Sequence, residues 1–296
     1  MNRLSPTSGA DAPAEWILTL SCPDRPGIVF EVSRFLLDRG CNVVQSQQFL
    51  DTAARRFFMR LQFQQDGSRP IDAADLRHDF TAVADSAMMH WRLTSTADKQ
   101  RVLILVSKYG HCLNDLLYRT STGDLDIVVP AVVSNHPDLE VIAQRYGIAY
   151  HHIPVTERTK PDAEAQLLDL VDSLDVDLVV LARYMQILST DLCAKLEGRA
   201  INIHHSMLPS FKGARPYHQA YQRGVKLVGA TAHYVTSDLD EGPIIEQEVT
   251  RVDHTLSAED VTALGRDNEC RALSRAVAWH TQNRILLDGG RTVVFS

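Results

Sequence analysis

The chain has 296 residues, of which 45% are hydrophobic and 23% charged, and its formal net charge is -7. This composition is typical of a soluble globular protein large enough for two domains, and no apolar run approaches the roughly 18 residues that a membrane span needs. The acidic balance disfavours a nucleic-acid binder, because affinity for phosphate needs a local excess of lysine and arginine. We therefore expect a cytoplasmic protein with a small-molecule partner and neither a nucleic acid nor a membrane as partner.

The five cysteines are odd in number, widely spread, and without a C-x-x-C pair. This pattern indicates neither a disulfide framework nor a zinc site, and no H-E-x-x-H spacing is present. We expect reduced, mostly buried thiols, and no metal or other cofactor.

The N-terminal third predicts a small α/β domain. Residues 1–14 are polar and small, which predicts a disordered tail without the apolar core of a signal peptide. The apolar run 17–20 predicts a strand, "CPDRPG" a turn, and the apolar residues from Ile28 to Leu36 a helix that ends at Gly40. Two strands at 41–51 and 55–64, a helix from about 71 to 83 and a strand near 88–93 complete the order βαββαβ, the ferredoxin-like plan.

The stretch "CPDRPGIVFEVSRFLLDRGCNVV" resembles the start of an ACT domain, and the resemblance covers residues 15–93. It implies that an amino-acid effector binds at the candidate residues Asp24, Arg25, Gly27 and Ile28, and that the domain mediates homo-oligomer formation. The residues allow this, because the free amides of a helix N-terminus can hold a carboxylate. The alternative is that Gly27 only lets the loop turn tightly before the helix.

Residues 94–100 are small, polar and charged, which predicts a linker. Beyond it, at 101–296, short apolar strands alternate with helical stretches, so we expect a Rossmann-like, mainly parallel sheet covered by helices. The predicted strands are 101–107, 126–134, 176–182, 200–206 and about 228–235, and the predicted helices are 111–120, 136–146, 161–174 and a long one at 257–282. The last helix opens with a capping-box pattern, Ser257 followed by Asp260.

Polar side chains interrupt the apolar strand "AINIHHS" at 200–206. Strand alternation places Asn202 and His204 on one face and sends His205 to the other. A lone strand histidine is more often a satisfied core residue, but two polar side chains on one face are typical of a site. The loop of "SDLDEGPII" offers a carboxylate partner, and Asp240 is weakly favoured because a buried strand follows it at once.

Three segments resemble the formyltransferase superfamily that uses 10-formyltetrahydrofolate: "INIHHSMLPSF", "GATAHYVTSDLDEGPIIEQ" and the helical insertion "LARYMQILS". The resemblance spans residues 101–296 and implies a catalytic triad of Asn202, His204 and Asp240. It also implies a pterin pocket along Leu181 to Ser189. The candidate substrate-binding residues are, within this segment, Arg183, Tyr184, Met185, Ile187 and Leu188, and, outside it, His233 and Gly242.

These residue types suit formyl transfer. Attack on the formyl carbon creates an oxyanion, and the Asn202 amide and a protonated His204 are preorganised donors for it. Asp240 can pair with His204 and accept the proton of the nucleophile. His233 either orients the loop of Asp240 or is a structural histidine. "PSFKGARPY" is predicted to form a loop at the mouth of the site, where Lys212 and Arg215 meet the acidic folate tail or remain solvated.

Members of this superfamily pass the formyl group to a purine precursor, a charged tRNA, an amino sugar or water. The segment "LVSKYGHCLNDLL", at the end of the first strand of this half, contains Gly110 as its only glycine, so the glycine-rich turn that would cradle a ribonucleotide phosphate is missing. We also expect no further basic domain of the kind that a tRNA-formylating member would carry. An ACT-like domain joined to this catalytic half resembles the deformylase members, which hydrolyse 10-formyltetrahydrofolate to tetrahydrofolate and formate for purine and one-carbon metabolism. The alternatives are transfer to an unidentified amine, or a non-catalytic, amino-acid-responsive folate-binding protein.

Overall fold

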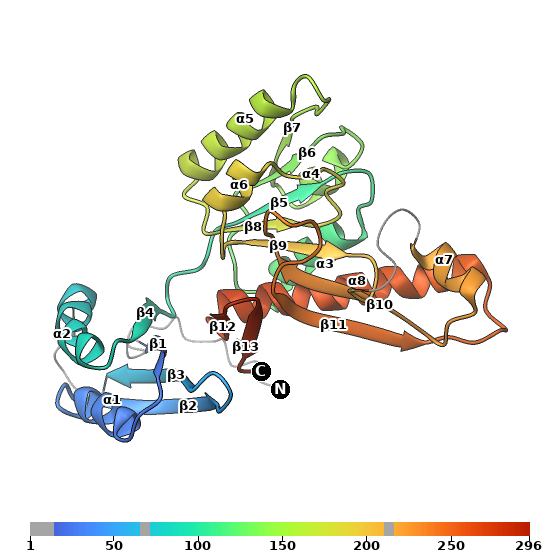
Figure 1. The fold of residues 1–296 in the computed structure, drawn as a ribbon. Coiled ribbons are helices and arrows are strands. Elements are labelled where there is room, and N and C mark those ends of the chain that lie inside the picture. Colours follow the sequence, from blue (N-terminus) through green and yellow to red (C-terminus); the bar gives the residue numbers. More distant parts are fainter. Residues whose placement is uncertain (1–14, 66–71, 210–215) are drawn as a thin grey trace, which may run out of the picture. The chain divides into compact units, whose positions relative to one another are not determined.

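The computed structural model describes residues 15–65, 72–209 and 216–296, and the chain divides into two compact units at the boundary between Asp98 and Lys99 (Figure 1). The predicted tail at 1–14 lies outside the described residues. No helix within the described ranges is both long and apolar enough to cross a membrane.

The N-terminal unit has the predicted ferredoxin-like order βαββαβ. Its sheet has the strand order β2-β3-β1-β4, with every neighbouring pair antiparallel. The elements are β1 (Glu15–Pro23), α1 (Ile28–Leu37), β2 (Cys41–Asp51), β3 (Arg56–Gln65), α2 (Ala73–Ser86) and β4 (His90–Ser95).

One hydrophobic cluster joins both helices of this unit to its sheet. Leu18 and Leu20 of β1 contribute alternate residues of one sheet face, and Val32 contributes the buried face of α1. The rings of Phe35 in α1 and Phe80 in α2 meet edge to face, with centroids 5.0 Å apart. The period-two and helical patterns read from the sequence therefore converge on a single core.

Two boundaries in this unit differ from the prediction. α2 begins after Asp72, whose side chain accepts a hydrogen bond from the amide of Ala74, and it continues to Ser86 because Ala84 extends its buried face. β4 begins at His90, since Met88 has a positive φ of 50° that a strand does not accommodate. It then pairs with β1 as far as Ser95, so the first two residues of the predicted linker belong to the sheet.

The C-terminal unit is built on a seven-stranded sheet within the described residues, with the order β11-β10-β9-β8-β5-β6-β7. The strands are β5 (Val102–Val106), β6 (Ala131–Ser134), β7 (Ala149–His152), β8 (Leu178–Leu181), β9 (Ala200–His204), β10 (Leu227–Tyr234) and β11 (Ile244–Arg251). The pairs from β9 through β8, β5 and β6 to β7 are parallel, while β10 runs antiparallel to both β9 and β11. The expected mainly parallel sheet is thus confirmed.

Helices cover both faces of this sheet (Figure 1). They are α3 (His111–Thr122), α4 (Glu140–Arg145), α5 (Lys160–Ser173), α6 (Thr190–Lys195), α7 (Pro216–Arg223) and α8 (Ala258–Thr281), and the hairpin β12 (Ile285–Asp288) and β13 (Arg291–Val294) follows. Ile104 of β5 packs in one cluster with Leu113 of α3, whereas Leu103 packs in another with Leu167 of α5. A fully apolar strand is required here because both of its faces are buried.

Some elements of this unit are shorter than predicted or were not predicted. The run 126–134 forms a strand only from Ala131, because Pro130 has no amide hydrogen for the ladder. The helix expected at 136–146 begins at Glu140, after a turn in which the amide of Glu140 donates to the carbonyl of Pro137. β7, the short helices α6 and α7, and the final hairpin were not predicted.

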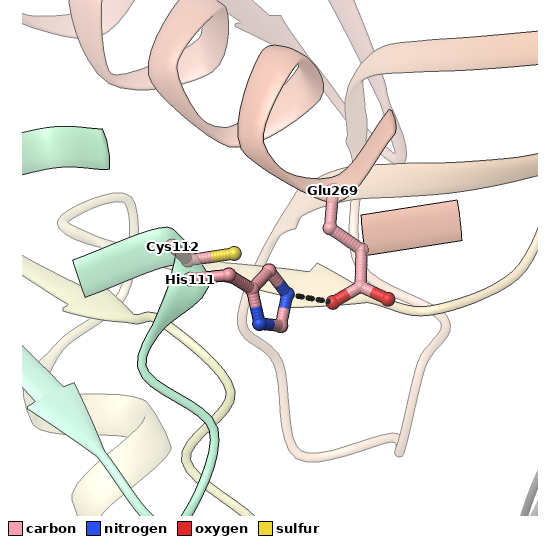
Figure 2. A group of neighbouring side chains, drawn as sticks. All are labelled: His111, Cys112 and Glu269. Atoms are coloured by element: carbon pink, nitrogen blue, oxygen red, sulfur yellow. Dashed lines mark hydrogen bonds and ion pairs between the residues drawn. The ribbon is translucent and has the colours of Figure 1, made fainter. Parts of the chain in front are cut away.

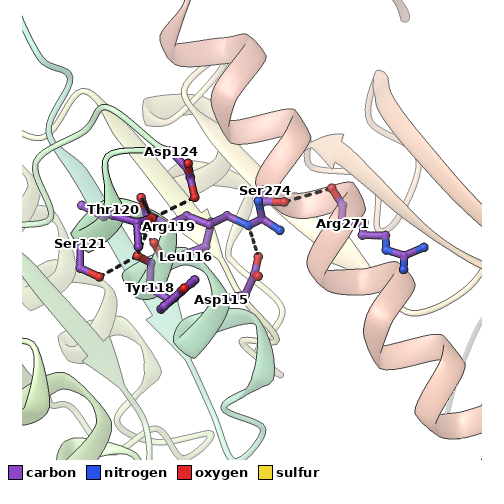
Figure 3. Close-up of polar contacts among 10 residues, drawn as sticks. Asp115, Leu116, Tyr118, Arg119, Thr120, Ser121, Asp124, Arg271 and Ser274 are labelled. Carbon is purple, nitrogen blue, oxygen red and sulfur yellow. Dashed lines mark hydrogen bonds and ion pairs between the residues drawn. The ribbon is translucent and has the colours of Figure 1, made fainter. Parts of the chain in front are cut away.

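The long helix α8 begins as predicted. Ser257 accepts a hydrogen bond from the amide of Asp260, and the Asp260 side chain accepts one from the amide of Ser257, which completes the capping box. α8 packs against α3, and Figure 3 shows polar side chains along the two helices, including Arg119, which donates to Asp115 one turn earlier. His111 of α3 and Glu269 of α8 meet between these two helices, with His111 Nε2 2.7 Å from Glu269 Oε2.

Candidate active site

A cavity of about 360 Å³ lies in the C-terminal unit over β9 and β10. Its walls are completed by two loops, residues 182–189 after β8 and residues 235–243 between β10 and β11. Asn202, His204, His233 and Asp240 all line this cavity. The structure therefore brings the three predicted catalytic residues together, although Asp240 lies 36 positions beyond His204 in the chain.

Asn202 is oriented by its neighbour across the sheet. The register of β9 and β10 places His233 opposite Asn202, and Asn202 Nδ2 lies 3.1 Å from His233 Nε2. The other ring nitrogen, Nδ1, lies 2.9 Å from the carbonyl oxygen of Tyr234, which can only accept a hydrogen bond. His233 Nδ1 must then carry the hydrogen, so Nε2 accepts from the Asn202 amide, and the second N–H of that amide remains for a ligand.

His233 is a neutral partner in this arrangement. Burial lowers the pKa of His233, and this outweighs the opposing effect of its hydrogen bond to Tyr234. The 3.8 Å separation between His233 Nε2 and Asp240 Oδ1 is accordingly no ion pair at neutral pH. In this structure His233 thus orients Asn202, whereas the predicted alternatives were orientation of the Asp240 loop or a structural role.

His204 and Asp240 form the charged centre of the cavity. His204 Nδ1 lies 3.1 Å from Asp240 Oδ1, and His204 Nε2 is buried without a hydrogen-bond partner among the described residues. Burial raises the pKa of Asp240, but the hydrogen bond and charge of His204 outweigh this and hold that pKa below its ordinary value. Asp240 is therefore ionised, and His204 keeps one ring nitrogen that has no partner among the described residues.

Gly242 allows the loop that carries Asp240 to close, and it does not itself line the cavity. A Cβ atom at Gly242 would lie 1.8 Å from the carbonyl oxygen of Tyr234, so the hairpin that carries Asp240 can close only with glycine there. Asp240 itself has a φ of 58°, in the left-handed region that aspartate tolerates better than most residues. Gly242, which was predicted to bind substrate, is not among the cavity-lining residues.

The segment 181–189 was expected to be a helical insertion, and this is wrong: only Leu181 belongs to an element, the last residue of β8, and the remainder is irregular. Arg183 has a positive φ of 68°, which interrupts any helix, and Ser189 caps α6. The five predicted pterin-pocket residues Arg183, Tyr184, Met185, Ile187 and Leu188 all line the cavity. Met185 is 53% and Ile187 61% exposed, so apolar side chains are held at an open surface, as binding of a flat heterocycle requires.

His205 was predicted to face away from the site, and this is also wrong. β9 ends at His204, so His205 lies in the bend that follows, where strand alternation no longer applies. Its ring centroid lies 5.1 Å from that of His204, and both rings line the cavity. Burial and the charge of Arg183 lower the pKa of His205 to about 4, so this imidazole is neutral at pH 7.

Beneath His205 lies a buried carboxylate that sequence reasoning missed. Glu269 of α8 accepts hydrogen bonds from Tyr217 (2.9 Å) and pairs with His111 (2.7 Å), and Arg183 Nε lies 3.4 Å from it. Burial raises the pKa of Glu269, but the His111 hydrogen bond and the Arg183 charge outweigh it and leave that pKa below the ordinary value. One sequence signal could have revealed it. Glu269 lies four residues after Gly265 and four before Leu273, so helical spacing places it on the apolar face of the helix, where a carboxylate is unexpected.

One group of side chains within the described ranges has the proximity expected of metal ligands: His111, Cys112 and Glu269 (Figure 2). Both Glu269 oxygens already have partners in His111 and Tyr217. Burial raises the pKa of Cys112 well above its usual range, which favours the thiol over the metal-binding thiolate. These contacts describe a hydrogen-bonded network better than a ligand set.

In the N-terminal unit the four candidate effector residues, Asp24, Arg25, Gly27 and Ile28, line one shallow depression. Gly27 caps α1 with a φ of 95° and without a side-chain hydrogen bond, so the first amides of the helix lack a side-chain cap. Arg25 donates two hydrogen bonds to Glu31. The loop that was predicted to carry Lys212 and Arg215 lies, at 210–215, outside the described residues.

Comparisons with known proteins follow the same division of the chain. Residues 16–73 match the ACT domain family, and residues 100–277 match the Formyl transferase family. A formyltetrahydrofolate deformylase from Corynebacterium sp. (strain P-1) is 54% identical over 94% of this chain and 97% of its own length.

Solved structures show both the whole arrangement and its catalytic part. The crystal structure of formyltetrahydrofolate deformylase from Burkholderia mallei has a TM-score of 0.91 and 48% identity, covering 96% of this chain and 100% of that chain. A phosphoribosylglycinamide formyltransferase from Anaplasma phagocytophilum has a TM-score of 0.62 and 35% identity, covering 67% of this chain and 96% of its own.

Proposed function

The chain belongs to the formyltetrahydrofolate deformylase family, and we propose that it is a hydrolase that converts 10-formyltetrahydrofolate to tetrahydrofolate and formate, the latter for purine and one-carbon metabolism. The observation that carries the proposal is the convergence of Asn202, His204 and Asp240 beside the apolar loop 182–189 in one cavity. The loop binds the pterin ring, and the three polar residues act on the formyl group.

The formyl oxygen becomes negatively charged when the nucleophile attacks, and two donors of the cavity can meet it. One is the second N–H of Asn202, whose first N–H is held by His233. The other is His204 Nε2, which has no other partner among the described residues. To donate there while Nδ1 donates to Asp240, His204 must be an imidazolium paired with that carboxylate.

Asp240 is the proton acceptor in this mechanism. As the water oxygen bonds to the formyl carbon, one water proton passes to the ionised Asp240. The tetrahedral intermediate then collapses, the bond from carbon to N10 breaks, and N10 takes the proton from Asp240. The formic acid product releases its remaining proton to solvent and leaves as formate.

This mechanism uses only side chains of this protein, so we propose that the reaction needs neither a metal nor another cofactor.

We also propose that a small amino acid binds at Asp24, Arg25, Gly27 and Ile28, where a helix N-terminus without a side-chain cap lies in a depression. The exposed apolar side chains of α1 and β2, among them Phe30 and Phe49, support assembly into a homo-oligomer. A cytoplasmic location accords with five free cysteines.

The deciding experiment incubates the purified protein with 10-formyltetrahydrofolate alone and measures formate and tetrahydrofolate. We expect both in equal amounts, at a rate unchanged by a chelator. Product only after an amine is added would identify a transferase instead. No turnover under either condition, with folate binding intact, would identify a non-catalytic binding protein.

A further inference from the structure

His205 differs from the other two imidazoles that line the cavity, His204 and His233, because its ring is not hydrogen-bonded to any described residue. Asn202 is bonded to His233, and His204 to Asp240. Within the described ranges, neither ring nitrogen of His205 has a hydrogen-bond partner, although the ring lines the cavity beside His204. A cavity ligand can therefore use both nitrogens of His205.

The chemical state of His205 is suited to a neutral ligand. Because burial and the charge of Arg183 keep the imidazole unprotonated, it offers one lone pair and one N–H. His204, in contrast, offers only a donor in the proposed mechanism. In that mechanism the rings of His204 and His205 therefore offer different groups to a ligand, and their centroids lie 5.1 Å apart.

One ring contact joins His205 to a hydrogen-bonded network that spans three helices. The ring of Tyr217 in α7 lies edge-on to that of His205, with centroids 6.5 Å apart. Tyr217 donates to Glu269 of α8, and Glu269 is held in turn by His111 of α3, a pair visible in Figure 2. This network, which has no part in the proposed catalytic steps, therefore contacts His205 through the ring of Tyr217.

A hydrolase has to bind a water molecule as its nucleophile, and water has no larger group by which the enzyme could hold it. An amine is a stronger nucleophile than water, and a water molecule is oriented only through its hydrogen bonds. In the proposed mechanism one water proton passes to Asp240, and the second needs a separate acceptor.

We propose that His205 binds the attacking water and accepts a hydrogen bond from the proton that the water keeps. The inference rests on the proposed hydrolysis. The proton held by His205 stays on the oxygen that becomes the hydroxyl of formic acid, so no bond is made or broken at His205. Removing this group should weaken the use of water more than the use of a stronger nucleophile.

The test compares water with hydroxylamine as acceptors, using full-length protein and 10-formyltetrahydrofolate. His205→Phe keeps a ring against Tyr217 but removes both nitrogens, and His205→Gln restores a polar acceptor. In the Phe variant we expect formate production to fall on the order of 10- to 100-fold with KM for the folate changed by less than about 3-fold. Formohydroxamate production should fall much less, and the Gln variant should regain part of the hydrolysis.

His218→Phe removes an exposed imidazole of α7 and serves as the control, with an unchanged ratio of the two products. An equal loss of formate and formohydroxamate in His205→Phe would overturn the inference, as would hydrolysis within about 2-fold of wild type. If the Phe variant does not fold, His205→Leu is measured in the same way with the same criteria. Failure of the wild type to release formate would instead overturn the proposed function.

Discussion

At the scale of single residues, Asp240 provides the most direct test of the catalytic proposal. Asp240→Asn keeps the shape of the side chain but removes the proton acceptor and the negative partner of His204. We expect turnover to fall on the order of 100- to 10,000-fold. Folate affinity, measured by fluorescence titration with tetrahydrofolate, should be preserved because the pterin ring is assigned to loop 182–189.

The matched control for this variant is Glu241→Gln. It neutralises the next carboxylate of the same loop, which is not among the cavity-lining residues. Turnover of this control should remain within a few-fold of wild type. A similar loss in both variants would mean that the net charge of the loop matters and that Asp240 has no particular role.

His205 makes a separate prediction about stability and pH. Its pKa is lowered from 6.5 to about 4, so as the pH falls below 6.5 the unfolded chain takes up this proton before the folded protein does. The contribution of His205 to stability is therefore complete above pH 6.5 and is lost as the pH falls toward 4. Between pH 6.5 and pH 5 the loss amounts to about 2 kcal/mol, at roughly 1.4 kcal/mol per pH unit.

Urea unfolding of wild type and His205→Phe at pH 7 and pH 5 measures how the free energy that His205 contributes to stability changes with pH. Titration of Asp240, Glu269 and the other groups around the cavity is common to both proteins and cancels in the difference. We expect the variant to gain about 2 kcal/mol relative to wild type on going from pH 7 to pH 5. A difference independent of pH would show that His205 is not held neutral.

At the scale of elements, the contact of Tyr217 in α7 with α8 depends on a glycine, Gly265. A Cβ atom at Gly265 would lie 2.1 Å from Cζ of Tyr217, so the ring can rest on α8 and reach Glu269 only because residue 265 is glycine. Gly265→Ala should raise helix propensity by roughly 0.5 to 1 kcal/mol. Displacement of the ring should outweigh this gain, since overpacking typically costs about 1 to 3 kcal/mol.

We therefore expect a lower midpoint of thermal unfolding in Gly265→Ala, together with reduced hydrolysis through the loss of support for His205. Gly290→Ala is the control, because no atom lies within 4 Å of a Cβ at that position. Calorimetry of the two variants decides the matter. Equal midpoints would show that Tyr217 can move aside at no cost.

At the scale of the whole molecule, the two units make separable contributions. The N-terminal unit, residues 15–98, has its own core and carries the candidate effector depression, whereas every cavity residue lies in the C-terminal unit. Removal of residues 1–98 should therefore abolish any response to amino acids and lower the assembly state, while the C-terminal unit retains its fold by circular dichroism.

Light scattering measures the assembly state, and formate release with and without each amino acid measures the response. Gly27→Val in the full-length chain is the more selective variant, since valine does not tolerate the φ of 95° at this position. It should weaken the response without changing assembly. A truncated protein that keeps both properties would contradict the regulatory assignment.

The sequence by itself determined the βαββαβ order of the N-terminal domain, the two-domain organisation, the mainly parallel sheet and, with a family resemblance, the three residues that meet in the cavity. A fully apolar strand such as 102–106 predicts a sheet with both faces covered, because only that arrangement buries every side chain of the strand. Asn202 and His204 could be paired because both lie within a strand of period two. Asp240 was only weakly favoured by local pattern, and resemblance to a family singled it out.

Only the tertiary structure decided what lies around those three residues. His205 was misplaced because periodicity cannot show where a strand ends, and one residue beyond the end its ring joins the site. Glu269 was missed because burial of a charge depends on partners distant in sequence: His111, Tyr217 and Arg183 come from three other segments. Local patterns reflect the neighbours of a residue along the chain, whereas the ionisation state of a buried group is set by its neighbours in space.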